Sequence, residues 1–533
     1  MYEGKCTGTV SCLALSRSTL NVANGKLEFF TPEHTETEST SIKYHLQLVS
    51  VEGETHELKG FKSINSNLSL SISETWRATT TVNFRIARKG DQAIGAGVVH
   101  ISVPQFLKQM RTFRTTEDFK SAHLLSLASF LIFFIYNIAL FFFRPFVPVQ
   151  FPKKAQKEKT LSKPPHSNIF SIKAVDGVQT VLEVYEPQLA LEHSNQPQNL
   201  NLPPVLCVPG VTGVGAEFNV YALPFLRCSM VEYFVARGHR CYALTPRWGC
   251  DNSVAKKATV FDCRLDVAAA LDHVYRKERQ KVYIVAHCQG SVALGMGLLD
   301  GTIHAYQILG ITANSVFMNQ VFGYWNSWKG CTTALILLYE ALAGNFFPMF
   351  SSNIDAAFQR ILDSLLRFYP VSDRRDLCTS TACHRTSFGF GLLWNHQNLD
   401  TQIHDNIHRF FAGTYTTLLR HVVRMGTHGK CLDNRLRPLL NAKNLQRLKG
   451  VPILFVSGTD NEVFNPETTL RDYELLRRTF GEAMYRRFLP EGYGHLDPIM
   501  GKNAVDDVYW RIFDHLHWCV QAQRSAACAN ETQ

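Results

Sequence analysis

The sequence has few charged residues for its length and almost no block of one sign. Asp, Glu, Lys and Arg make up 19% of the 533 residues, and the formal net charge of +10 is spread along the chain apart from a short basic segment at 153–159. Nucleic-acid-binding proteins concentrate positive charge on one face or segment, so no nucleic-acid partner is expected. The diffuse charge instead favours attraction to an anionic membrane surface.

The chain also lacks the sequence features of a secreted, disulfide-rich protein. Its fourteen cysteines are scattered without repeated close pairs, and no positively charged stretch followed by an apolar one stands at the N-terminus. We therefore expect mostly reduced thiols facing the cytosol. The apolar content of 45% and the length predict packed globular protein with two or three domains.

Long helical patterns are missing from the first hundred residues. Short β-like runs, broken by Asn, Gly, Ser and Glu clusters, predict an all-β domain over residues 1–115, built as a small sandwich or barrel. The predicted strands are 26–30, 42–51, 57–61, 79–87 and 96–101.

An apolar run without formal charge extends from Leu124 to Phe143, inside a predicted membrane helix at 121–145. Its length matches the roughly 30 Å of a bilayer core, so a single-pass helix is predicted, with a re-entrant or monotopic anchor as a variant. A buried helix of a soluble protein is the alternative. Basic residues are in excess after the run, which places the large domain in the cytosol, with the endoplasmic reticulum as a candidate membrane. A Lys- and Pro-rich linker follows at 146–168.

Strand-like and helix-like segments alternate from residue 169 to 525, which predicts an α/β domain with a parallel sheet, ahead of a tail at 526–533. A long insertion at about 314–448, rich in Phe, Leu and Trp, is placed to form a helical lid over the site. The predicted strands are 205–208, 240–244, 282–286, 307–312 and 453–457.

The segment Val282–Leu299 is the centre of the functional prediction. An apolar run reaches His287, and small and aliphatic residues follow, which predicts a strand, a sharp turn and a buried helix. Ala286 and Gly290 are small residues two positions either side of Cys288, as the turn of a nucleophile elbow requires. The alternative is an inert buried cysteine at a strand-to-helix junction.

The partners of a thiol nucleophile follow in the order expected for an α/β-hydrolase. Asp460 comes directly after a predicted strand, with Glu462 as an alternative acid, and His495 lies in a Gly-rich loop before the last helix. We predict a triad of Cys288, Asp460 and His495, with a thiolate favoured by the helix N-terminus and the histidine. A structural histidine beside an inactive elbow is the alternative.

The loop after the first strand of this domain is predicted to complete an oxyanion hole. The backbone N–H groups of Val211 and Gln289 would hold the developing negative charge. A phosphate-cradling loop is the alternative, but the spacing of Gly210, Gly213 and Gly215 is not that of a dinucleotide-binding loop. No cofactor is therefore expected.

A second group of cysteine and histidine residues lies within the predicted lid. Cys378, Cys383, His384 and His396 suggest zinc, but the Cys-x4-Cys spacing is loose and no second pair of standard spacing completes four ligands. We expect a disulfide or ordinary packing, and no metal.

The motifs Ala286-His287-Cys288-Gln289-Gly290 and His495-Leu496-Asp497 resemble those of acid lipases with the α/β-hydrolase fold, whose elbow reads G-H-S-Q-G. The resemblance implies the nucleophile's place for Cys288, the acid's for Asp460 and the base's for His495. Cysteine in the place of serine departs from the pattern.

A wider likeness covers nearly the whole chain. Segments including 76–81, 378–385 and 493–504 are similar to the region after the flavin domain in cholesterol-oxidase-like fusions of the GMC oxidoreductase class. This implies a sterol or other lipid substrate. The chain departs by having no flavin half, since no G-x-G-x-x-G follows an N-terminal strand.

Together these features predict a membrane-associated hydrolase of lipid or sterol esters or thioesters. A cysteine-dependent acyltransferase is the alternative within enzymes, because cysteine elbows also occur in polyhydroxyalkanoate synthases. A lipid-binding scaffold that retains the fold without catalysis is the alternative outside them.

Overall fold

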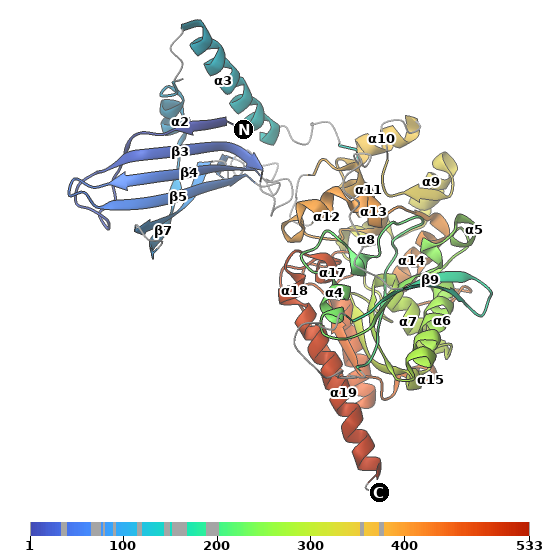
Figure 1. The fold of residues 1–533 in the computed structure, drawn as a ribbon. Coiled ribbons are helices and arrows are strands. Elements are labelled where there is room, and N and C mark those ends of the chain that lie inside the picture. The colour runs from blue at the N-terminus through green and yellow to red at the C-terminus, as the bar shows by residue number, and fades with distance from the viewer. Residues whose placement is uncertain are drawn as a thin grey trace. The chain divides into compact units, whose positions relative to one another are not determined.

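A computed structural model describes residues 2–32, 40–64, 76–77, 80–88, 92–114, 120–142, 150–151, 168–187, 202–351, 357–372 and 378–531. The chain forms two compact units, Met1–Pro148 with Arg374–Thr379, and Val149–Asp373 with Ser380–Gln533 (Figure 1). The predicted linker at 146–168 lies outside the described residues, apart from 150, 151 and 168.

The first unit contains one antiparallel sheet, where the sequence predicts a sandwich or barrel. Its order is β1-β3-β4-β5-β6-β7, with β2 paired to β3, and each predicted strand overlaps one of β3 to β7. The elements are β1 (Tyr2–Lys5), β2 (Thr9–Val10), β3 (Leu20–Pro32), β4 (Thr40–Val49), β5 (Thr55–Ile64), β6 (Thr81–Arg88), β7 (Gln92–His100), α2 (Val103–Met110) and α3 (Lys120–Phe142).

Helix α3 supplies the apolar layer that a second sheet would otherwise provide. Phe134 of α3 is buried in one cluster with Phe29 and Phe30 of β3. Phe130 also meets Phe29 edge to face, with ring centroids 5.1 Å apart. Edge-to-face rings pack favourably, so this aromatic cluster fixes the helix on the sheet.

The predicted single membrane-spanning helix at 121–145 is not supported. Within the part of the chain that the structure describes, no helix has the length and apolarity to cross a bilayer. One face of α3 is covered by the sheet, while Leu125, Ile132 and Ile135 on the helix are exposed.

The second unit is built on an eight-stranded sheet of order β17-β16-β13-β12-β10-β11-β9-β8. Neighbouring strands from β17 to β11 are parallel, whereas β9 is antiparallel to β11 and to β8. The strands are β8 (Asn168–Lys173), β9 (Gln179–Tyr185), β10 (Val205–Val208), β11 (Cys241–Thr245), β12 (Val282–His287), β13 (Ile308–Asn314), β16 (Ile453–Val456) and β17 (Tyr485–Phe488). All five predicted strands are present, and β8, β9 and β17 are additional.

Helices cover both faces of this sheet. Helices α4 and α19 contact each other, as do α6 and α7, and the two pairs lie on opposite sides (Figure 1). The mostly parallel sheet and the strand–turn–helix passage from β12 to α7 make this an α/β-hydrolase-like fold. The bounds are α4 (Met230–Val235), α5 (Asn252–Ala255), α6 (Val260–Glu278), α7 (Cys288–Asp300), α16 (Glu467–Phe480), α17 (Asp497–Met500), α18 (Ala504–Asp507) and α19 (Tyr509–Glu531), so α19 extends into the predicted tail at 526–533.

The long insertion between β13 and β16 is mostly helical where it is described. Its elements are α8 (Tyr324–Lys329), α9 (Ala334–Ala343), β14 (Phe346–Pro348), α10 (Ala357–Leu366), α11 (Thr381–Phe390), η5 (His396–Asn398), α12 (Thr401–Asp405), α13 (Ile407–Phe410), β15 (Gly413–Tyr415), α14 (Thr416–His428), α15 (Ala442–Leu445) and η6 (Gln446–Leu448).

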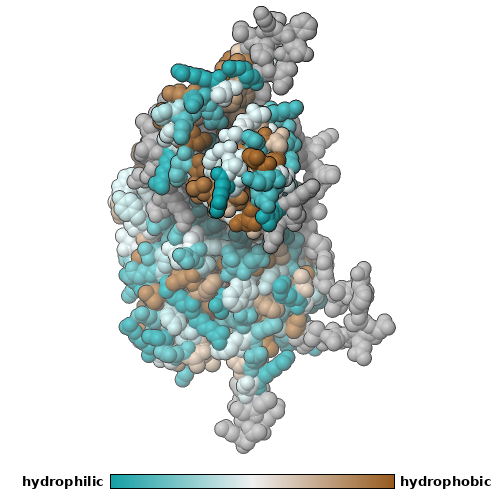
Figure 2. Space-filling model, turned by 90° about the vertical axis from the view of Figure 1, so that its left-hand side faces the viewer, coloured by the Kyte–Doolittle hydropathy of each residue, from teal (hydrophilic) through white to brown (hydrophobic). Residues whose placement is uncertain are grey.

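On the face of the molecule shown in Figure 2, hydrophobic residues lie in separate groups among hydrophilic ones.

Two buried side chains hold the strand ends that carry the candidate site. The hydroxyl of Tyr221 lies within hydrogen-bond distance of two carbonyl groups, those of Val208 at 3.3 Å and Val285 at 3.2 Å. The indole of Trp248 donates to the carbonyl of Gly210 at 3.2 Å. The ends of β10 and β12 and the loop after β10 are therefore tied together.

Candidate active site

Cys288 occupies a sharp turn between β12 and α7. Its φ of 50° lies in the left-handed region, which costs a residue with a side chain about 1–3 kcal/mol and is found mainly where function requires it. A Cβ on Gly290 would lie 2.2 Å from the carbonyl oxygen of Pro209, and one on Gly210 would lie 2.7 Å from the Cβ of Cys288. Only glycine therefore fits at these two positions without a shift of the backbone or of the nucleophile.

The structure places His495 close to Cys288. The sulfur of Cys288 and ring nitrogens of His495 and His287 lie within 4.8 Å of one another. The rings of His287 and His495 are also in contact, with centroids 4.7 Å apart. A thiol and an imidazole so close together are the pair that nucleophilic catalysis requires.

The hydrogen bonds around Asn461 fix the tautomer of His495. Oδ1 of Asn461 accepts from the backbone N–H groups of Val463 and Phe464, both at 3.2 Å, so this amide atom is an oxygen. Nδ1 of His495, 3.1 Å from the same oxygen, must therefore carry a proton and donate it. The lone pair is then on Nε2, which is buried and has no hydrogen-bond partner within the described residues.

The residue that accepts the hydrogen bond from Nδ1 of the imidazole is thus Asn461, one position after the predicted Asp460. Asp460 accepts from Nδ2 of Asn395 at 3.1 Å, and Glu462 accepts from the backbone N–H of Tyr324 at 3.0 Å. Asp460 and Glu462 are thus hydrogen-bonded to residues of other segments, whereas the side chain of Asn461 reaches the histidine. Sequence reasoning missed Asn461 because it searched for a carboxylate, although cysteine-dependent enzymes also use a Cys-His-Asn constellation.

Burial keeps both members of the thiol–imidazole pair neutral at rest. It raises the pKa of Cys288 to about 12, although the backbone N–H groups of Gln289 and Val211 oppose this. Burial also holds the pKa of His495 well below its usual value, and the adjacent His287 lowers it further. The expectation of a resting thiolate is therefore wrong, because loss of hydration outweighs the helix N-terminus.

The neutral pair predicts a particular pH dependence for alkylation of Cys288. The rate with iodoacetamide is expected to rise about tenfold per pH unit between about pH 6 and pH 9, because only the rare thiolate reacts. Mass spectrometry of the Cys288 peptide would follow the rate, with the exposed Cys331 as a reference for the reagent. A rate that levels off below neutral pH would indicate a thiolate–imidazolium pair and contradict this assignment.

Two backbone N–H groups point at the nucleophile. Those of Val211 and Gln289 both lie close enough to the sulfur of Cys288 to lower its pKa by hydrogen bonding. They are the two donors predicted for the oxyanion hole, and they come from the loop after β10 and from the first turn of α7. Negative charge that develops beside the sulfur would therefore meet preorganised donors.

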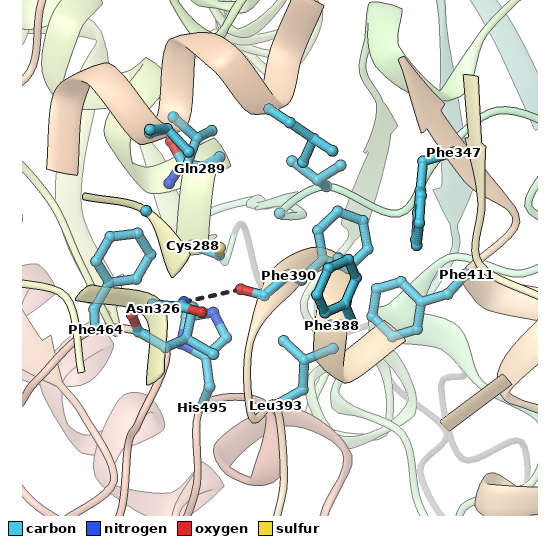
Figure 3. Close-up of a pocket in the computed structure, with 18 of the residues that line it drawn as sticks. Cys288, Gln289, Asn326, Phe347, Phe388, Phe390, Leu393, Phe411, Phe464 and His495 are labelled. Carbon is cyan, nitrogen blue, oxygen red and sulfur yellow. Dashed lines mark hydrogen bonds between the residues drawn. The ribbon is translucent and has the colours of Figure 1, made fainter. Parts of the chain in front are cut away.

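The sulfur opens into an apolar cavity beneath the lid (Figure 3). Asn326 of α8 helps to shape it, since Nδ2 donates to the carbonyls of Phe390 at 3.0 Å and Val463 at 3.2 Å. The lid contributes mainly aromatic and aliphatic residues to the cavity wall, namely Phe322, Leu335, Ile336, Tyr339, Phe347, Phe388, Phe390, Leu393, Phe411, Leu419, Val422 and Val423. Such a wall suits an acyl chain or another apolar group.

Replacement of Asn461 by alanine should reduce kcat by about 100-fold, because the imidazole loses the acceptor that fixes its orientation and tautomer. Replacement of Asp460 by alanine is the matched control and should change kcat little. Steady-state kinetics with one ester substrate would compare the two variants. A greater loss of kcat in Asp460→Ala than in Asn461→Ala would indicate that Asp460 is the acid, as predicted from the sequence.

The site residues could also bind a soft metal ion. His287, Cys288 and His495 offer one sulfur and two nitrogen ligands in close proximity. An ion there would occupy the nucleophile and the base together, so it would inhibit the thiol chemistry.

No protein-family model matches the sequence, and no curated protein matches it either. Similar solved structures include a soluble variant of monoglyceride lipase from Saccharomyces cerevisiae in complex with a substrate analog, at 12% identity and a TM-score of 0.35, over 69% of this chain and 98% of that one. An esterase from Pyrococcus furiosus is 10% identical with a TM-score of 0.36, over 70% and 98%. An epoxide hydrolase from Vigna radiata is 13% identical with a TM-score of 0.34, over 66% and 97%. Likeness at this level identifies no activity, and the resemblance to cholesterol-oxidase-like fusions stays a prediction.

Proposed function

We propose that the second unit is a cysteine-dependent hydrolase of carboxylic esters or thioesters with an apolar acyl group. The observation that supports this most directly is the position of the Cys288 sulfur, which has an imidazole and two backbone N–H donors beside it and an apolar cavity in front of it. Each of these features alone has a structural explanation. Their combination at one strained turn has the parts that acyl transfer needs.

The proposed reaction begins with proton transfer from the Cys288 thiol to Nε2 of His495 as the sulfur attacks the substrate carbonyl carbon. The carbonyl oxygen takes the negative charge and accepts hydrogen bonds from the N–H groups of Val211 and Gln289. The carbon–oxygen bond to the alcohol then breaks, and the imidazolium of His495 protonates the leaving oxygen. Water then attacks the acyl thioester on Cys288 and gives a proton to the same nitrogen. The carbon–sulfur bond breaks, the free acid leaves, and the imidazolium returns the proton to the sulfur of Cys288.

The proposed substrates are esters of long-chain or sterol-derived lipids, because the cavity wall offers apolar contacts. Each additional buried methylene contributes about 0.8 kcal/mol, so kcat/KM should rise about 15-fold with each lengthening of the acyl chain by two carbons until the cavity is full. Hydrolysis of an ester series with wild type and Cys288→Ala tests the function. A binding scaffold would retain lipid affinity in both proteins and hydrolyse none of the series.

Acyl transfer to an alcohol is the second candidate reaction, and the apolar cavity around the proposed thioester favours it by limiting access of water. Addition of a long-chain alcohol to the assay would separate the two. A new ester product that forms faster than the free acid identifies a transferase.

We further propose that the protein associates with a membrane surface. Leu337, Leu338 and Leu342 of α9 are exposed on the lid, and the net charge of +10 favours anionic lipid. Sedimentation with vesicles of phosphatidylcholine and phosphatidylserine should deplete the protein from solution. Binding that is unchanged in L337D/L338D would assign the attachment to another surface.

A further inference from the structure

The lid contains a compact group of sulfur and nitrogen ligands outside the candidate active site. Cys383 comes from α11, His396 from η5 and His404 from α12, and all three are buried. Their ligand atoms lie within 4.8 Å of one another, and the sulfur of Cys383 is 3.4 Å from Nε2 of His396. Three elements of the lid therefore converge on one point through metal-ligand side chains.

The chain supplies a fourth ligand next to this group. Cys378 lies five residues before Cys383, and only one residue separates it from Ser380, the N-cap of α11. The chain itself thus brings its sulfur to the three other ligands, and Cys378 counts with them as one group of possible metal ligands. The result is a set of two cysteines and two histidines.

This set matches zinc in ligand type and in spacing. Zinc takes four ligands at about 2.3 Å for sulfur and 2.0–2.1 Å for nitrogen, which places neighbouring ligand atoms in a tetrahedron about 3.5 Å apart. The distance of 3.4 Å between the sulfur of Cys383 and Nε2 of His396 is close to that of such an edge. We propose that Cys378, Cys383, His396 and His404 bind one structural zinc ion. The expectation of no metal from sequence considered local spacing alone, and His404 was not recognised because it reaches the group only through the fold.

The proposed zinc ion would fasten the lid beside the loop that carries His495. The segment between α11 and α12 is bonded directly to that loop. The backbone N–H of Leu496 donates to the carbonyl of Leu393 at 2.7 Å, and Nδ2 of Asn398 donates to the carboxylate of Asp497, also at 2.7 Å. Since four protein ligands leave no open position, the ion would have a structural role and no direct part in the reaction.

Metal analysis of the full-length protein tests the inference independently of any activity. Protein purified without chelator is expected to hold about one zinc ion per chain. Cys383→Ser and His404→Ala should each lose most of it. Cys250→Ser, which changes a half-buried cysteine outside the group, is the matched control and should retain it. Cys288→Ser should also retain it, because the elbow residues form a separate group.

Cobalt substitution keeps the test decisive if the lid variants fail to fold. Wild type loaded with Co²⁺ should show thiolate-to-cobalt absorption, and removal of the metal should lower Tm by about 5 °C or more. Folded wild type without stoichiometric zinc, zinc that is lost with Cys288→Ser, or a Cys378–Cys383 disulfide found by mass spectrometry would each overturn the inference.

Discussion

Replacement of Cys288 by alanine is expected to lower kcat for ester hydrolysis by about 10⁴-fold or more. The variant loses the only group at the turn that can form the covalent intermediate, while the donors of Val211 and Gln289 and the cavity remain. KM should change little, since the cavity wall provides most of the contact with the acyl group. Steady-state kinetics on a long-chain ester measures both constants.

The controls for this experiment use other members of the site. His495→Ala should lose a similar factor, and the double variant should lose little more than either single one, because residues that act as a unit are not additive. Cys250→Ala removes a half-buried thiol that lies outside the cavity wall, and it should retain activity. Unchanged hydrolysis in Cys288→Ala would assign the activity to another residue.

Replacement of Gly290 by alanine is expected to disrupt the elbow. The new Cβ would lie 2.2 Å from the carbonyl oxygen of Pro209, a backbone atom that can move only if the loop after β10 moves with it. Such overpacking typically costs about 1–3 kcal/mol of folding free energy. The same displacement separates the two oxyanion donors, so kcat should fall by about 10²-fold or more.

The matched control lies in the same helix. A Cβ on Gly295 would meet the side chain of Phe317 at 3.3 Å. Alanine stabilises a helix by about 1 kcal/mol relative to glycine, which offsets the cost of this close contact. Thermal unfolding and kinetics of the two variants would compare them. Equal effects of Gly290→Ala and Gly295→Ala would show that the close approach at the elbow is not required.

The frame of the site could be predicted because it depends on local patterns. All five predicted strands of the second unit are present, since each is a short apolar run between turn residues. The elbow was recognisable from the small residues around Cys288, because a strained turn excludes larger side chains. The missed strand β17 reads Tyr485-Arg486-Arg487-Phe488, and its charged residues hide it from a search for apolar runs.

The details that could not be predicted depend on contacts between distant segments. Whether Asp460, Asn461 or Glu462 faces the histidine is set by the direction of each side chain in one turn, which the sequence does not encode in a visible pattern. The sequence of helix α3 predicts a membrane segment because a helix that packs on an aromatic sheet face and a helix that faces lipid need the same apolar residues. The group formed by Cys383, His396 and His404 is assembled by three separate elements of the lid.

The ionisation of the nucleophile shows where local reasoning leads in the wrong direction. A helix N-terminus and a nearby histidine both predict a low pKa for Cys288. In the structure, burial raises the pKa of Cys288 instead, which favours loss of the proton during the attack over loss before it. The reaction would then resemble serine hydrolases, in which the base acts in the transition state.

The central claim is that Cys288 carries the acyl group between the two half-reactions, and trapping that intermediate tests it most directly. Wild type mixed with a long-chain ester and quenched in acid should gain the mass of one acyl group, on the Cys288 peptide, and neutral hydroxylamine should remove it. Cys288→Ala should gain nothing. An acyl group on another residue, or ester turnover with no covalent intermediate at any quench time, would contradict the account.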